Sequence, residues 1–340
     1  MRAAVYSRTG DPDVLTVVDK ESASPGPGEV LVAIRYSGVN PTDWKSRRGS
    51  GPGQPVEPAQ TPHHDGAGVI ESVGPGVDAA RHGQRVWTWE AAYARPEGTA
   101  QQLALIPAAH AVTLPDSAGF ELGASLGVPF LTAHRCLTVA EDGPERLGPG
   151  ALAGRVILVA GGAGAVGNAA IQLARWADAT VISTVSSPSK AQLAAAAGAD
   201  HVVNYREQDV VAEVRKIAPH GVHSIVEVSP AQNAELDAAV LANNGSVAIY
   251  ANNGGDSFSL PVRPNMTTNA RWQFVLLYNV PHGAKERAVD SVSAAVAAGA
   301  VRVGDDAGLP LHRYALDDIA AAHQAVEDGA VGKVLIDLQA

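Results

Sequence analysis

A glycine-rich turn between two apolar segments is the part of the sequence that most directly suggests chemistry. Gly162, Gly164 and Gly167 follow the apolar run at residues 155–160 and satisfy the pattern G-x-G-x-x-G. Residues 168–177 then carry apolar side chains at helical spacing. Glycines let the backbone turn tightly beside a pyrophosphate, and the N-terminus of the following helix attracts the anion. The segment predicts a dinucleotide-binding turn formed by Gly162, Gly164, Ala165, Val166 and Gly167; a glycine-rich turn without a ligand is the alternative.

The end of the next apolar run, residues 180–185, indicates which dinucleotide this would be. Proteins that bind NAD place an acidic residue near this position, where it holds the ribose 2′-hydroxyl. Residues 179–199 include no Asp or Glu, and Ser186, Ser187 and Lys190 stand there instead. Hydroxyls and an ammonium suit a 2′-phosphate, which favours NADPH over NADH. Ser187, with a proline after it, is also an ordinary helix N-cap, and one serine can serve both purposes.

Composition limits the classes of protein to consider. The chain has 340 residues and a formal net charge of −10, with 46% hydrophobic and 18% charged residues. No apolar run reaches the roughly 18 residues of a membrane span, and the N-terminus lacks a signal peptide's apolar stretch. Nucleic acid is an unexpected partner at this charge. The single cysteine, Cys136, excludes an internal disulfide and a cysteine-based zinc cluster. We expect a cytoplasmic protein of two domains.

The pattern of elements changes near residue 116. Before it, short alternating strands with frequent Gly and Pro predict an irregular β-barrel. Strands are expected at 1–6, 15–18, 30–36 and 83–87, and a loop at 51–58. After it, strands alternate with helices, which predicts a parallel sheet with helices on both faces. Helices are expected at 118–127, 132–139, 192–197, 210–217, 234–241, 285–298 and 317–327. Strands are expected at 199–205, 224–228, 246–251, 271–278, 309–314 and 332–336.

Several sequence runs together resemble the medium-chain dehydrogenase/reductase superfamily, and within it the zinc-free quinone oxidoreductase (zeta-crystallin-like) branch. They lie at 38–43, 65–70, 131–133, 161–167, 198–200, 204–207 and 332–334. The resemblance implies an α/β protein with a GroES-like irregular β-barrel domain and a Rossmann domain whose parallel sheet is doubly wound. The GroES-like domain would comprise residues 1–123 and 302–340, and the NADP-binding domain residues 124–301. It also implies an active site in the cleft between the domains and a homodimer formed through residues 271–280.

The family comparison also addresses zinc. Zinc-dependent relatives carry Cys at the positions of Asn40 and Val128, and His-Glu at the positions of His64 and Asp65. A catalytic zinc needs about three protein ligands, and only His64, with Asp65, remains. We therefore predict no metal. On a strand, adjacent side chains point to opposite faces, so His63 and His64 would not bind one metal ion together. We expect each of them instead to be a hydrogen-bonded histidine of the core or the cleft.

Further cofactor contacts follow from the resemblance. Lys190 and Tyr205 match a Lys and a Tyr that bacterial quinone reductases place around the 2′-phosphate. Lys333 is expected to approach the same phosphate from the C-terminal strand. Thr132 is expected to face the nicotinamide or the cofactor's phosphates.

Three features depart from the family pattern. Asp178 stands where relatives usually have Gly, so that turn is expected to differ. The family's active-site Tyr is replaced by Trp44 or Lys45. Asn252 and Asn253 are unusual and follow an expected strand at its carboxyl end, where ligands bind open α/β sheets. We expect them near the nicotinamide.

The predicted reaction is hydride transfer from NADPH to a quinone, because no zinc would be present to polarise a simple carbonyl. Asn40 is hypothesised to donate a hydrogen bond to the acceptor oxygen, with Lys45 and His64 as weaker candidates for proton delivery. Alternatively, Asn40 has no catalytic role and is only a turn residue before Pro41. Two other functions stay open: an NADPH-dependent reductase of α,β-unsaturated ketones, and an NADPH-binding structural or regulatory protein without turnover.

Overall fold

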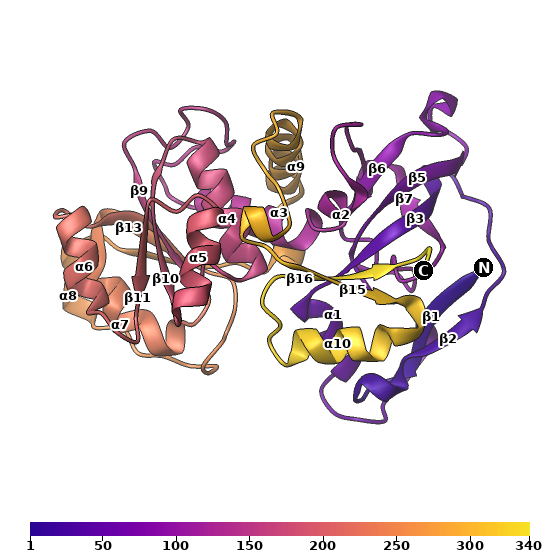
Figure 1. The fold of residues 1–340 in the computed structure, drawn as a ribbon, viewed down its shortest axis with the longest axis horizontal. Helices are drawn as coiled ribbons and strands as arrows, with labels where there is room; N and C mark the ends of the chain where they lie inside the picture. Colours follow the sequence, from indigo (N-terminus) through magenta and orange to yellow (C-terminus); the bar gives the residue numbers. More distant parts are fainter. The chain divides into compact units, whose positions relative to one another are not determined.

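The computed structural model describes residues 1–340, which divide into two compact units. The first unit comprises residues 1–128 and 311–340, and the second residues 129–310. These boundaries differ by five and nine residues from those expected at 123/124 and 301/302. The C-terminal strand β16 pairs with β3 of the first unit, so both ends of the chain belong to that unit (Figure 1).

The first unit is built on a seven-stranded sheet in the order β15-β16-β3-β5-β6-β8, with β7 also paired to β3. A three-stranded sheet in the order β2-β1-β4 accompanies it. Alternate residues of β3 and its neighbours point into one core that includes Val32, Ile34, Ile70 and Ile336. The strands are β1 (Arg2–Arg8), β2 (Thr16–Asp19), β3 (Glu29–Val39), β4 (Pro55–Gln60), β5 (Asp65–Val73), β6 (Arg85–Thr88), β7 (Leu103–Pro107), β8 (Ala111–Thr113), β15 (Leu311–Ala315) and β16 (Lys333–Asp337). The helices are α1 (Pro41–Arg48), α2 (Phe120–Gly123) and α10 (Ile319–Glu327).

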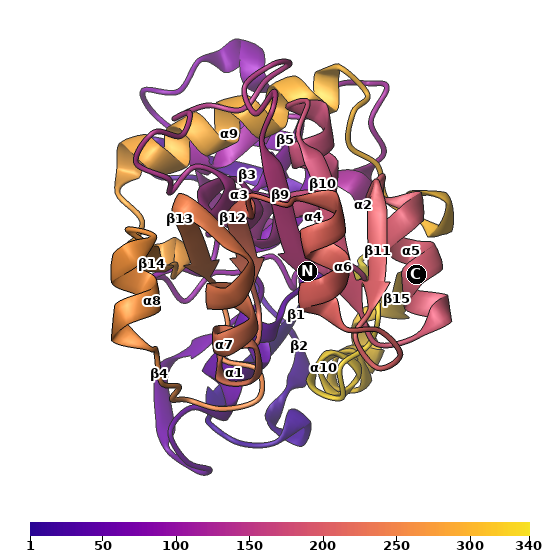
Figure 2. The ribbon, with the colours of Figure 1, turned by 90° about the vertical axis from the view of Figure 1, so that its left-hand side faces the viewer.

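The second unit holds a six-stranded parallel sheet in the order β11-β10-β9-β12-β13-β14. The order reverses at β9 and β12, as expected for a doubly wound sheet. Because crossovers are right-handed, helices cover both faces, with α4 and α5 on one side and α6 and α7 on the other (Figures 1 and 2). The strands are β9 (Val156–Ala160), β10 (Thr180–Val185), β11 (His201–Asn204), β12 (Val222–Glu227), β13 (Leu241–Ile249) and β14 (Arg271–Phe274). The helices are α3 (Gly127–Leu137), α4 (Ala165–Trp176), α5 (Pro188–Ala196), α6 (Val210–Ile217), α7 (Pro230–Val240), α8 (Val262–Thr267) and α9 (His282–Ala297).

The parallel sheet and the β-rich domain were both expected, and both are confirmed, but some elements differ. Strand β4 occupies part of a segment expected to be a loop. It pairs only with β1, at a sheet edge, which is where strands tolerate proline. The helix expected at 118–127 is only the single turn α2, and the helix expected at 132–139 begins earlier, as α3. Strand β14 ends before the expected residue 278, and α8 was not expected. No helix has the length and apolar content that a bilayer crossing requires.

Asp178, which stands where family members usually have Gly, lies in the turn before β10 and has a strained backbone. Asp178 has a φ of 65°, in the left-handed region that favours glycine. Its Oδ2 accepts a hydrogen bond of 2.6 Å from the backbone N–H of Gly150. The carboxylate therefore offsets part of the strain that its own Cβ introduces.

Substitutions at Asp178 separate these two effects. Asp178→Ala keeps the strain and loses the hydrogen bond, so the free energy of unfolding should fall by about 1 kcal/mol. Asp178→Gly loses the bond but relieves the strain, so its change should stay below about 0.5 kcal/mol. Urea denaturation measures both; equal losses in the two variants would show that the backbone strain is negligible.

Candidate functional site

The glycine turn is closely packed between β9 and α4. A Cβ added to Gly162 would lie 2.0 Å from Oγ of Ser183 on β10. A Cβ added to Gly167 would lie 2.4 Å from the carbonyl oxygen of Gly161. Side chains at these two positions would push the first turn of α4 away from the sheet. The glycines therefore bring the helix N-terminus against the carboxyl end of β9.

The N-terminus of α4 presents free backbone donors at this point. Gly164 is the N-cap, and the N–H groups of Ala165 and Val166 in the first turn have no acceptor within the helix. The turn lies where the strand order reverses between β9 and β12, the place where open α/β sheets bind ligands. Thr132 is a buried residue of α3, and its contact with a cofactor stays a prediction.

The structure places four of the five residues predicted for the 2′-phosphate at the carboxyl ends of β10 and β11: Ser186, Ser187, Lys190 and Tyr205. Ser187 caps α5 by accepting a 3.3 Å hydrogen bond from the N–H of Lys190. The Lys190 ammonium donates to Oγ of Ser186 at 3.2 Å. Tyr205 is held by its backbone N–H, 3.0 Å from the Val185 carbonyl oxygen, and its side chain is 52% exposed. Hydroxyls and one ammonium thus meet at this corner.

Asn252 and Asn253 are exposed residues just beyond the carboxyl end of β13. The N–H of Asn253 donates to the Val228 carbonyl oxygen at 3.1 Å. Its own carbonyl oxygen accepts from Oγ of Ser229 at 2.7 Å. The Asn252 amide donates to Asp256. The segment is therefore tied to the β12–α7 turn, which follows the strand beside the glycine turn.

A buried polar cluster forms in the first unit around Lys333, the first residue of β16. Its ammonium donates to Oδ1 of Asn40 at 2.7 Å and lies 3.4 Å from Oδ2 of Asp65. The Asn40 amide donates to the same Asp65 oxygen at 2.7 Å. The other Asp65 oxygen accepts from the N–H of Val128 at 2.8 Å. All three side chains are at most 2% exposed. The cluster thus joins β16, β5, the start of α1 and the start of α3.

Burial sets the protonation of this cluster. It raises the pKa of Asp65, while the Lys333 ammonium and the Asn40 amide oppose that rise. It lowers the pKa of Lys333, which the charges of Asp65 and Asp43 oppose. Burial, with the Asp65 charge added, raises the pKa of Asp43 to about 8, even though its carboxyl accepts from the Asn40 N–H. Lys333 and Asp65 form the ion pair that balances the cluster.

One predicted role is corrected by this geometry, and two stay predictions. Lys333 was expected at the 2′-phosphate, but its ammonium is buried against Asn40 and Asp65. Asn40, expected to donate to an acceptor oxygen, is 2% exposed and its amide links Asp65 to Lys333. Burial lowers the pKa of His64, a candidate for proton delivery, to about 4. Lys45 is exposed on α1, with its ammonium 5.8 Å from the Trp44 ring centre, and its role stays a prediction.

His63 belongs to a separate buried chain of hydrogen bonds that the sequence did not indicate. It precedes β5 with a φ of 80°, so the strand geometry expected for it is wrong. Thr99 Oγ1 must donate to the Asp65 carbonyl oxygen, so it accepts from Ser37, 2.7 Å away. Ser37 Oγ in turn accepts from Nδ1 of His63 at 2.8 Å. Nε2 of His63 then accepts from Nε2 of His323 at 2.9 Å. The carbonyl at one end fixes the tautomers of both histidines.

The donors in the first unit do not fit a zinc ion. No group of three or more His, Cys, Asp and Glu side chains in residues 1–340 is placed to hold a metal. The Lys333 ammonium lies beside Asn40 and Asp65, which the family resemblance aligns with a zinc ligand and with the neighbour of a zinc ligand. An ammonium there would repel a divalent cation.

Lys333→Met tests the ion pair. The variant leaves the Asp65 carboxylate buried without its counter-charge, so the free energy of unfolding at pH 8 should fall by about 3–5 kcal/mol. The loss should shrink at pH 5, where Asp65 can take up a proton. Urea denaturation of the double variant Asp65→Asn/Lys333→Met supplies the control, since it removes both charges and should lose less. A double variant less stable than the single one would contradict the pairing.

The sequence matches two described families over separate segments. Residues 26–116 match the alcohol dehydrogenase GroES-like domain, and residues 165–294 match the zinc-binding dehydrogenase family. A quinone oxidoreductase of Lama guanicoe is 32% identical over 100% of this chain and 98% of its own. The Homo sapiens quinone oxidoreductase is 28% identical over 99% of this chain and 97% of its own.

Solved structures agree with the sequence relatives. Escherichia coli quinone oxidoreductase, solved in complex with NADPH, superposes with a TM-score of 0.80 at 25% identity, covering 99% of this chain and 100% of that one. A protein described as an NAD-dependent alcohol dehydrogenase gives a TM-score of 0.85 at 26% identity, covering 99% and 100%. Fold, glycine turn and full-length similarity lead to one conclusion: the chain belongs to the medium-chain dehydrogenase/reductase superfamily, in its quinone oxidoreductase branch.

Proposed function

We propose that this protein is an NADPH-dependent, zinc-independent quinone oxidoreductase. The observation that carries the proposal is the corner formed by Ser186 and Lys190, which offers hydroxyls and an ammonium where an NAD-binding protein would place a carboxylate. The similarity to quinone oxidoreductases over the whole chain supports the same cofactor and acceptor. The ammonium of Lys333 among the zinc-ligand positions supports independence from zinc.

Different residues of the chain would bind different parts of the cofactor. The backbone of the glycine turn would hold the pyrophosphate at the N-terminus of α4, and Ser186 with Lys190 would hold the 2′-phosphate. When bound, NADPH supplies the hydride from its nicotinamide ring. A quinone is already electrophilic and needs no metal to accept that hydride. Lys45, exposed on α1, and His64 are the candidates for supplying a proton to the reduced oxygen.

Binding measurements on Lys190→Gln test the choice of cofactor, and a panel of acceptors tests the substrate. The variant removes the ammonium but not the cap or the glycine turn, so the Kd for NADPH should rise about tenfold or more while the Kd for NADH stays unchanged. Cofactor oxidation is followed with a benzoquinone, a naphthoquinone, a linear enone and a simple aldehyde, each with NADPH and with NADH. Quinone turnover with marked preference for NADPH is the expected result.

Lys216→Gln is the matched control, because Lys216 is an exposed lysine of α6 paired with Glu213. It should change neither Kd. Equal rates with NADPH and NADH would contradict the phosphate site. Turnover of the enone alone would replace the quinone by an α,β-unsaturated ketone. Tight NADPH binding without turnover of any acceptor would favour a binding role.

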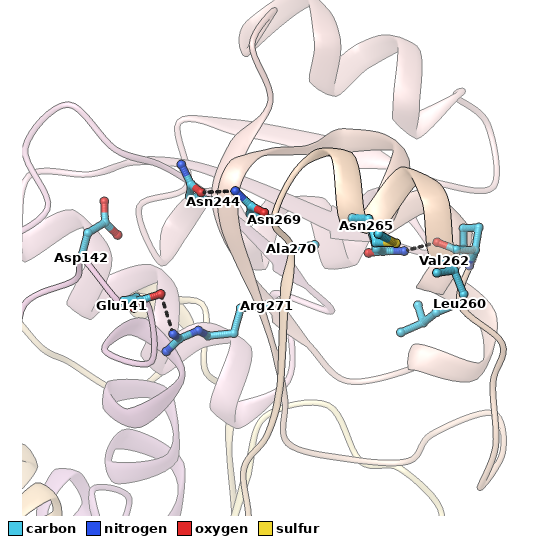
Figure 3. A pocket seen from close by; sticks show the side chains of 11 residues that line it. Glu141, Asp142, Asn244, Leu260, Val262, Asn265, Asn269, Ala270 and Arg271 are labelled. Atoms are coloured by element: carbon cyan, nitrogen blue, oxygen red, sulfur yellow. Dashed lines mark hydrogen bonds and ion pairs between the residues drawn. The ribbon is translucent and has the colours of Figure 1, made fainter.

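We also propose that two copies pair through the edge of the parallel sheet. Strand β14 is the last strand of that sheet and leaves one side of its backbone unpaired. Exposed apolar side chains surround it: Phe274 is 64% exposed, Leu276 57% and Met266 69%. A pocket of about 910 Å³ beside this strand is lined from β13, β14, α8 and the segment after α3 (Figure 3). A second copy would cover both the edge and the apolar side chains.

Phe274→Asp/Leu276→Asp should convert a dimer into a monomer, since each charge would be buried against the partner's apolar surface. Sedimentation velocity or light scattering after gel filtration measures the mass. Val18→Asp, which changes a partly exposed apolar residue of the first unit, is the control and should leave the mass unchanged. A monomeric parent protein would refute the proposed pairing.

A further inference from the structure

A pocket of about 400 Å³ lies in the second unit, between the end of α3, the first half of α9 and the start of β14. Three guanidinium groups line it: those of Arg135 on α3, Arg271 on β14 and Arg287 on α9. Two carboxylates, Glu141 and Glu145, line the same pocket from the segment after α3. A chain with a formal net charge of −10 therefore has an excess of cations at this place.

Two of the three guanidinium groups lack a full set of partners. Arg135 is partly buried, and its guanidinium makes no hydrogen bond or ion pair with another group of residues 1–340. Nε of Arg287 is buried and has no hydrogen-bond partner, and its ion pair with Glu145 spans 3.6 Å. Donors are thus left over on two helices that face one pocket.

The two carboxylates neutralise the pocket only from its exposed rim. The Glu141 side chain is 86% exposed and pairs with Arg271 at 2.8 Å (Figure 3). The Glu145 side chain is 78% exposed. Exposed ion pairs of this kind contribute little to stability. Either carboxylate can therefore turn into solvent when an anion that binds more strongly enters the pocket.

Positive charge near the end of α3 has no buried counter-charge. Burial lowers the pKa of Arg135, and the charge of Arg287 lowers it further. Burial also lowers the pKa of His134 to about 3, with the charges of Arg135, Arg287 and Arg146 adding to the effect. His134 is 1% exposed, and neither of its ring nitrogens has a hydrogen-bond partner. The like charges remain close together although nothing inside the protein compensates them.

The pocket lies at the edge of the parallel sheet opposite to the glycine turn. Arg271 is the first residue of β14. The segment after α3 is held by Arg155, which precedes β9 and donates to the Asp142 carbonyl oxygen at 2.9 Å. Because the strands are parallel, their amino ends share one edge, and the glycine turn lies at the other. The pocket is therefore separate from the residues predicted to bind NADPH.

We propose that Arg135, Arg271 and Arg287 form a binding site for a small anion that carries a phosphate group. The N–H donors of a guanidinium fit the oxygens of a phosphate. A phosphate group carries a charge of about −1.5 to −2 at pH 7, so it outcompetes the single charge of a rim carboxylate. A volume of about 400 Å³ holds either the free ion or a small phosphate ester. The site does not rest on the proposed function.

Isothermal titration calorimetry of the full-length protein tests the site with inorganic phosphate and with glycerol phosphate, each in chloride buffer at constant ionic strength. The parent protein should bind at least one of them, and the lower Kd distinguishes the free ion from the ester as the source. Sodium acetate, which carries one charge, should give no binding heat. Absence of binding by both phosphates would overturn the proposal.

Arg135→Gln and Arg287→Gln should each raise the Kd for the bound phosphate about tenfold or more. Without phosphate, the Tm of Arg135→Gln should equal that of the parent or exceed it, because the lost guanidinium makes no hydrogen bond and repels Arg287. Arg302→Gln is the matched control, because Arg302 is an exposed arginine of the same unit outside the pocket, and its Kd should not change.

Glu145→Gln should have the opposite effect and lower the Kd about threefold or more, because its carboxylate no longer competes for Arg287. Phosphate held at the cofactor site would give a different pattern. Its Kd would rise in Lys190→Gln and stay unchanged in Arg135→Gln, and that result would overturn the proposal.

Discussion

The first unit depends on one buried cation. The Lys333 ammonium neutralises Asp65 and holds the Asn40 side chain, and those two residues fix the entry to α1 and the start of α3. A carboxylate at that depth is tolerated because the ammonium and two further hydrogen-bond donors, the Asn40 amide and the Val128 N–H, surround it. The same region in zinc-dependent relatives would be organised by metal ligands. Here an ammonium on a strand joins these elements.

The two units satisfy buried charge by different means. The first pairs an ammonium with a carboxylate, whereas in the second the buried Glu227 accepts from neutral donors, the N–H of Ser229 and the Asn233 amide. At the glycine turn the second unit again uses neutral donors, since backbone N–H groups at the start of α4 face the expected anion. Backbone donors cannot titrate, so pyrophosphate recognition would be insensitive to pH. Any pH dependence of binding would then arise outside this turn.

The features that could be predicted from the sequence are those set by residues close together in the chain. The glycine spacing, the absence of acidic residues at 179–199 and the strand–helix alternation are local patterns, and the fold and the serine–lysine corner agree with them. The role of Lys333 could not be read in this way, because its partners lie 268 and 293 positions away and only strand pairing brings them together. His323 was missed for the same reason.

The return of β16 to the first unit has a consequence for biosynthesis. A ribosome makes the chain from its N-terminus, so Asp65 and Asn40 emerge long before the lysine that neutralises them. The second unit is one continuous segment and can complete its sheet while translation is still under way. The first unit cannot, because β15, β16 and α10 are made last. Until then its central strand β3 has an open edge, and this nascent intermediate is the form most dependent on chaperones and most vulnerable to premature termination.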